Sequence, residues 1–178
     1  MNQQLRQMVM DAIAFGDVMD QSSLGVAAFG QEEKTSRFIR ADLVKFLLYL
    51  SASDDVISEK ETAFFRDYLG YNFETSTITS LVEQFGLKKD EFLNEIPFSM
   101  YVMIEADSKV IAYNGENPGS AMALLAVYHA LGSAFAACDD AVAEEEKKDF
   151  SAYLSMLKEQ IILAENTASE AYKAKKAE

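Results

Sequence analysis

Apolar residues recur every three or four positions through most of the chain, which is the spacing of an amphipathic helix. No alternating strand pattern competes with them. The pattern predicts helices over residues 3–20, 35–53, 58–69, 76–85, 88–95, 97–112, 119–138 and 143–165. Pro97 and Pro118 stand where helices would begin. We therefore predict an all-α helical bundle, with one domain over 1–165 and a frayed helical tail or linker over 166–178.

An internal repeat with an offset of 85 residues relates two parts of the chain. Residues 52–69 and 137–154 are identical at eight of eighteen aligned positions. The same offset aligns residues 38–53 with 123–138, so each copy predicts a long buried helix, a tight acidic turn and a shorter amphipathic helix. We expect two helix-turn-helix hairpins that pack about a pseudo-twofold axis. The segment between them supplies further candidate core residues, which are Phe92, Ile96, Phe98, Tyr101, Val102 and Ile104.

The two turns, ASDDVISEKE and ACDDAVAEEE, resemble the signature of the TerB-like (tellurite-resistance) family. That signature has a helix end with alanine, then Asp, a small or acidic residue, a hydrophobic residue, and Glu seven positions after the Asp. The family often has glycine after the first Asp, where this chain has Asp55 and Asp140. The resemblance implies an all-α module associated with stress response and tellurite resistance, alone or joined to ATPase and co-chaperone modules. It also implies acidic clusters that are proposed to bind metal.

The acidic turns are candidates for a cation site on chemical grounds as well. Asp54 and Glu61 flank the first turn, and the repeat brings Asp139 and Glu146 to a related place. Four carboxylates could then converge, with Asp55 and Asp140 beside them. Hard oxygen ligands of this kind suit a divalent cation such as calcium or magnesium. The candidate metal ligands are therefore Asp54, Glu61, Asp139, Glu146, Asp55 and Asp140.

Helix capping is the alternative explanation of the same residues. Ser58 and Glu61 have the spacing of a capping box, in which each side chain bonds the backbone N–H of the other residue. In the second copy Ala143 replaces Ser58, so half of the box is lost while Glu146 and both aspartates remain. The sequence leaves both explanations open.

Charge and composition narrow the class of partner. The chain has 16 basic and 29 acidic residues and a net charge of -13, and its lysines are scattered, so nucleic acid is not an expected partner. A single cysteine, Cys138, is compatible with a reducing, cytoplasmic location. Residues 117–138 carry no formal charge, but their alanines, glycines and serines favour a buried bundle helix over membrane insertion.

No set of residues for nucleophilic catalysis is recognisable. His129 is the only histidine, and Cys138 is followed by Asp139, whose charge would raise a thiol pKa. We therefore expect no enzyme. Two functions remain: a TerB-like stress-response module whose acidic turns bind a cation or a basic partner, or a protein-interaction or regulatory domain of a larger ATPase or chaperone assembly without metal.

Overall fold

The structure is a computed structural model that describes residues 2–21, 34–51, 57–85, 92, 94–138 and 144–177. Every regular element in these ranges is a helix, as predicted. The elements are α1 (Gln3–Asp20), α3 (Thr35–Ser51), α4 (Glu59–Phe64), the π-helical turn η1 (Phe65–Leu69), α5 (Thr75–Phe85), α7 (Phe98–Asn114), α8 (Ser120–Ala136) and α9 (Glu144–Ala177). None of these helices is long and apolar enough to cross a bilayer.

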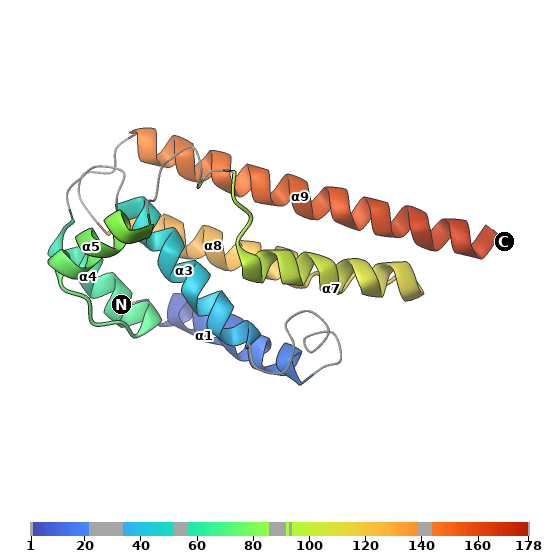
Figure 1. The fold of residues 1–178 in the computed structure, drawn as a ribbon, viewed down its shortest axis with the longest axis horizontal. Helices are drawn as coiled ribbons and strands as arrows, with labels where there is room; N and C mark the ends of the chain where they lie inside the picture. The colour runs from blue at the N-terminus through green and yellow to red at the C-terminus, as the bar shows by residue number, and fades with distance from the viewer. Residues whose placement is uncertain are drawn as a thin grey trace.

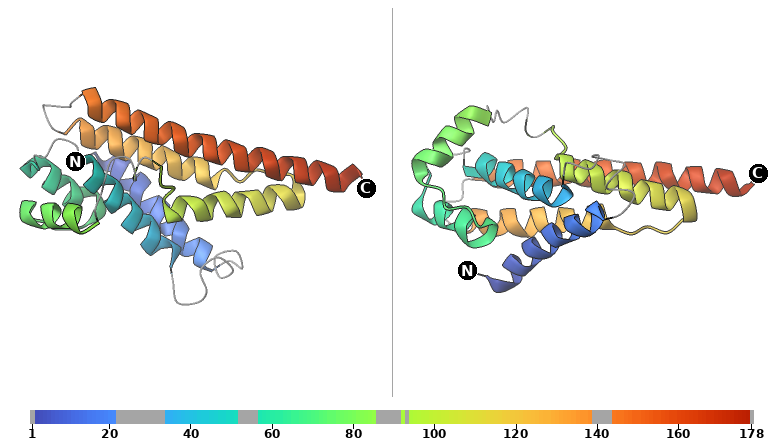
Figure 2. Two further views of the ribbon diagram at one scale, coloured as in Figure 1. Left: turned by 45° about the horizontal axis from the view of Figure 1, so that its top comes forward. Right: turned by 60° about the horizontal axis from the view of Figure 1, so that its bottom comes forward.

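The helices α7 and α8 form the middle of the bundle (Figure 1). The long helix α9 runs along both of them, and α1 lies on the opposite side, where it packs on α3 and α8. The short elements α4, η1 and α5 gather at one end, while the C-terminal end of α9 projects from the other (Figure 2). This arrangement puts α8 in contact with helices on several sides, which explains its mostly apolar sequence.

Aromatic side chains join the two repeated segments. Phe46 of α3 packs against Phe150 and Tyr153 of α9, with ring centroids 6.0 and 5.8 Å apart. Phe135 of α8 packs against Phe64 and Phe65, with centroids 5.2 and 6.1 Å apart. The helix that precedes each acidic turn thus contacts the helical residues that follow the other turn.

A glycine makes this aromatic packing sterically feasible. A Cβ atom placed on Gly132 of α8 would lie 2.4 Å from Cε2 of Phe150 and 2.8 Å from Cζ of Phe46. Real Cβ atoms do not approach other heavy atoms so closely, so any larger residue would push the two rings away.

Three aspartates cap the N-termini of helices other than their own. Asp20 accepts the Thr35 N–H at the start of α3, at 2.7 Å. Asp42 in α3 accepts the Ser99 N–H of α7, and Asp107 in α7 accepts the Ala121 N–H of α8. The residues Pro97 and Gly119 that directly precede α7 and α8 provide no side-chain cap. Each aspartate therefore supplies the acceptor that the local sequence lacks.

The last helix is longer than the sequence predicts. It does not end near residue 165, as its periodicity predicts, but continues to Ala177. Ala168 is buried, and the Tyr172 ring lies against Gly115, where an added Cβ would be 2.5 Å from Cε1. Contacts with the end of α7 therefore extend the helix.

The predicted core of the middle segment is confirmed in part. Phe92, Val102 and Ile104 are buried, whereas Phe98 and Tyr101 are exposed. The helical pattern of α7 is apolar on most sides, so periodicity alone could not separate its buried face from its exposed face. The helix predicted over 88–95 falls mostly on residues outside the described ranges.

Candidate functional site

The predicted metal ligands are only partly covered by the structure. Asp54, Asp55, Asp139 and Asp140 lie outside the described residues. Glu61 lies in the first turn of α4, and Glu146 belongs to the first turn of α9. Within the residues that the structure does describe, no group of three or more histidine, cysteine, aspartate or glutamate side chains could hold a metal ion.

Glu61 takes part in the capping box that its spacing predicts. The Ser58 N–H donates to Oε2 of Glu61 at 2.6 Å, and the Glu61 N–H donates to Oγ of Ser58 at 3.2 Å. Only 6% of Glu61 is exposed. One of its carboxylate oxygens thus already accepts a hydrogen bond from the protein, and the predicted capping box is confirmed.

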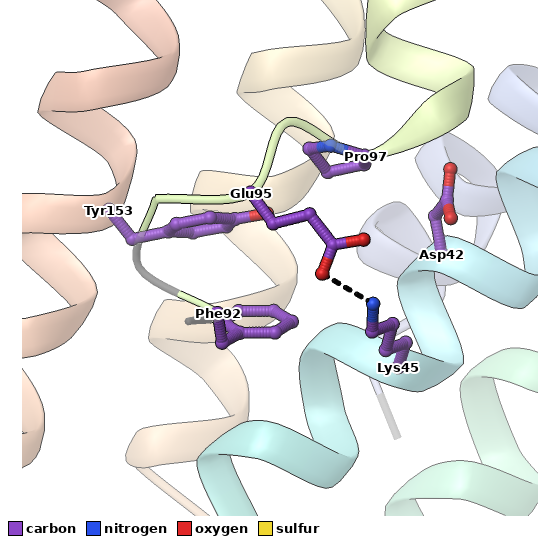
Figure 3. Close-up of a pocket in the computed structure, with 6 residues that line it drawn as sticks. All are labelled: Asp42, Lys45, Phe92, Glu95, Pro97 and Tyr153. Carbon is purple, nitrogen blue, oxygen red and sulfur yellow. Dashed lines mark hydrogen bonds and ion pairs between the residues drawn. The ribbon is translucent and has the colours of Figure 1, made fainter. Parts of the chain in front are cut away.

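A small pocket lined by charged and aromatic side chains lies between α3, α9 and the segment before α7, where the sequence predicts no site (Figure 3). Lys45 and Glu95 form an ion pair of 2.6 Å at its mouth, and the Lys45 ammonium lies 5.9 Å from the centre of the Phe92 ring. Tyr153 and Pro97 line the same space. The pocket encloses about 10 Å³, which is room for one water molecule and for no substrate.

Asp42 is a further ionisable residue that lines this pocket. Its Oδ2 accepts the Ser99 N–H at 2.7 Å. Burial raises the pKa of Asp42, and its hydrogen bonds with Ser99 oppose that rise. A perturbed carboxylic acid next to a tyrosine can mark an acid-base site. Here the carboxylate caps α7, so its geometry indicates a structural role.

The tyrosines near Asp42 are not bases either. Burial raises the pKa of both Tyr128 and Tyr153, and the negative charge of Asp42 raises them further. Both phenols therefore stay neutral at physiological pH. The sequence offered one signal for this cluster: Asp42 lies on the same helical stripe as the buried residues Ile39 and Phe46, where a charge is unusual.

A larger apolar groove opens between α1 and the helices α7 and α8. It encloses about 360 Å³. Its lining includes Met8, Asp11 and Phe15 from α1, with Met103, Pro118 and Leu124 opposite. Met8 is 37% exposed and Phe15 is 40% exposed. Both side chains thus present apolar surface to solvent within a concave site, which is typical of a binding surface.

The apolar face of α1 continues past the groove. Val18 lies three residues after Phe15, so it falls on the same side of the helix, and it is 59% exposed. Among the lining residues that the structure describes, Asp11 is the only charged one, and its Oδ1 accepts a hydrogen bond of 2.7 Å from the Gln7 side chain. The site is therefore apolar at its base and acidic at its rim.

A second, shallower depression lies between α8 and α9. It encloses about 270 Å³ and is lined by Met122, Leu125, His129 and Lys158, among others. His129 is exposed here. Ser155 also lines the depression, but most of its surface is apolar, so it offers mainly apolar contact surface.

Comparison of the chain with protein-family models, with curated proteins and with solved structures finds no match.

Proposed function

We propose that this chain is a non-catalytic helical module that acts by binding a partner protein through the groove between α1, α7 and α8. The observation that carries the proposal is the exposure of Met8 and Phe15 inside a concave, mostly apolar site of about 360 Å³. Burying those side chains against a partner would release free energy at about 25 cal/mol per Å² of apolar surface. The pocket at Asp42 has no comparable space.

We further propose that the module belongs with TerB-like domains and takes part in stress response or tellurite resistance. The repeated acidic turns support this assignment. The aromatic contacts support it too, because Phe65 and Phe150 are equivalent in the repeat and each packs against the long helix of the other segment. Such exchange is what two hairpins related by a pseudo-twofold axis would produce.

Site-specific photo-crosslinking tests the groove in cells. A photoreactive residue at position 8 or 15 should crosslink to a partner, while the same residue at position 163, which is also exposed and lies on α9, should not. The partner identified by mass spectrometry is then purified, and its dissociation constant is measured for the wild type and for Phe15→Asp. Crosslinks from position 163 alone, or an unchanged dissociation constant, would refute the groove as the binding surface.

Cation binding at the acidic turns is the second candidate function. It is favoured by the repeat, in which Glu146 and two aspartates persist although Ala143 has replaced the capping serine. Calorimetry with calcium, magnesium and manganese on the wild type and on the double variant Asp54→Asn, Asp139→Asn tests it. Heat of binding in the wild type that the double variant loses would support a cation site, and no heat with any of the three ions would exclude it.

A further inference from the structure

We infer that the occupant of the groove is an amphipathic helix from a basic partner protein. This inference rests on the proposed function, and it adds the conformation and the charge of the segment that binds. Three features of the groove carry it: its length, the chemistry of its base and the charge of the helices around it.

The groove and the adjoining apolar face of α1 together form a surface whose length fits a helix better than a small molecule. Exposed apolar side chains extend along α1 from Met8 to Val18. Ten helical residues span about 15 Å at a rise of about 1.5 Å per residue. A helix of about three turns would cover that distance and insert side chains at positions i, i+3, i+4 and i+7. A small ligand in the main cavity would leave Val18 uncovered.

The chemistry of the base also suits inserted side chains. Met8 and Met103 line the groove from opposite sides. Methionine is unbranched and polarisable, so it adjusts its shape to leucine, isoleucine or phenylalanine side chains of a bound helix. Ile39 and Leu124 are buried below and give the groove a fixed apolar base. Recognition by apolar anchors is therefore expected to provide most of the affinity.

The charge of α1 and of the whole chain favours a basic partner. The helix α1, which forms one side of the groove, contains one basic and three acidic residues, and Asp11 lies at the rim of the groove itself. The whole chain has a net charge of -13. A second copy would carry the same charge and be repelled, whereas lysines and arginines along the exposed face of a helix would be attracted.

Designed peptides test conformation and charge separately. The probe is a leucine and lysine peptide of about 18 residues, with leucine at i, i+3, i+4 and i+7 so that it can form an amphipathic helix. One control has the same composition with the leucines scattered, and a second has glutamate in place of every lysine. Calorimetry gives the dissociation constants, and NMR of labelled methionine methyl groups reports the binding site.

We expect the basic amphipathic peptide to bind and to shift the methyl signals of Met8 and Met103, while Met156 of α9 stays unchanged. Phe15→Asp should weaken binding by about tenfold or more, because it places a charge among apolar anchors. Leu163→Asp is the matched control, since it adds the same charge at an exposed apolar residue of α9, and it should not weaken binding. Asp11→Asn should lower affinity and reduce its dependence on salt.

Several results would overturn the inference. Equal binding of the scattered peptide would contradict the inference that the occupant is helical. Equal binding of the acidic peptide would contradict the inference that the occupant is basic. Self-association that Phe15→Asp abolishes would assign the groove to a second copy of the chain. If the crosslinked partner engages positions 8 and 15 through an acidic or non-helical segment, the proposed function stands and this inference fails. If no partner engages those positions, the proposed function fails.

Discussion

The carboxylate of Asp42 in α3 accepts the backbone N–H of Ser99 in the first turn of α7, at 2.7 Å and across 57 positions of sequence. Asp107 in α7 accepts the Ala121 N–H of α8 in the same way, at 2.9 Å. These bonds combine two functions, because each satisfies a helix N-terminus and fixes one helix against another. The contacts of α7 with α3 and with α8 therefore depend in part on these two carboxylates.

Replacing Asp107 separates its hydrogen bond from its charge. Asp107→Asn keeps an oxygen that can accept the Ala121 N–H and removes a charge that is 1% exposed, so its free energy of unfolding at neutral pH should equal or exceed that of the wild type. Asp107→Ala loses the acceptor and should lower that free energy by about 1–2 kcal/mol. Urea denaturation measures both. An equal loss in the two variants would contradict this role of the carboxylate.

The pH dependence of stability should reflect the same residue. Burial raises the pKa of Asp107 above its ordinary value, and the charge of Glu165 adds to that rise. The folded state therefore holds this proton more tightly than the unfolded state, so the contribution to stability is complete below the unfolded pKa and is lost as the pH rises through the folded pKa. The stability advantage of Asp107→Asn over the wild type should thus be largest at neutral pH and shrink as the pH falls toward 4. A difference that does not vary with pH would show that the pKa is not raised.

Two glycines allow the contact at the end of α9 to be tested. Gly115 and Gly119 both have positive φ angles, of 82° and 73°, but only an added Cβ at Gly115 would meet the Tyr172 ring. Alanine at either position should cost about 1 kcal/mol through backbone strain. Gly115→Ala should also release residues near Tyr172, which hydrogen exchange of 168–177 would detect. Faster exchange in Gly119→Ala to the same degree would indicate that the ring contact does not hold the helix end.

The capping role of Ser58 predicts a stability effect that needs no metal. Ser58→Ala removes the acceptor of the Glu61 N–H and should lower the free energy of unfolding by about 1 kcal/mol in a buffer with chelator. Thr79→Ala serves as a control, because Thr79 is exposed inside α5 and bonds only the carbonyl of Thr75. A loss in Ser58→Ala that appears only with added calcium or magnesium would favour the cation explanation instead.

In this chain, sequence patterns predict local structure better than they predict tertiary contacts. The bounds of α1, α5 and α8 agree closely with their helical periodicity, and the Ser58 capping box follows from spacing within one turn. The extent of α9 and the role of Asp42 could not be predicted in this way, because each depends on residues many positions distant. Their contacts are set by packing and not by propensity.

The groove could not be predicted from the sequence, for a related reason. Met8 belongs to the same apolar stripe of α1 as the buried residues Leu5 and Val9. Periodicity identifies such a stripe but does not tell how much of it neighbouring helices cover. For the acidic turns the situation is reversed. Their chemistry is evident in the sequence, but Asp54 and Asp139 lie outside the residues that the structure describes.

The contact of Phe46 with Phe150 and Tyr153 also bears on the order of events during synthesis. The ribosome synthesises α3 about a hundred residues before Phe150 and Tyr153. During that time Phe46 belongs to a nascent chain that still lacks these two rings. Native packing around this ring is thus postponed until the start of α9 has emerged. A stalled or truncated product that ends before it would expose an aromatic surface to the quality-control machinery of the cell.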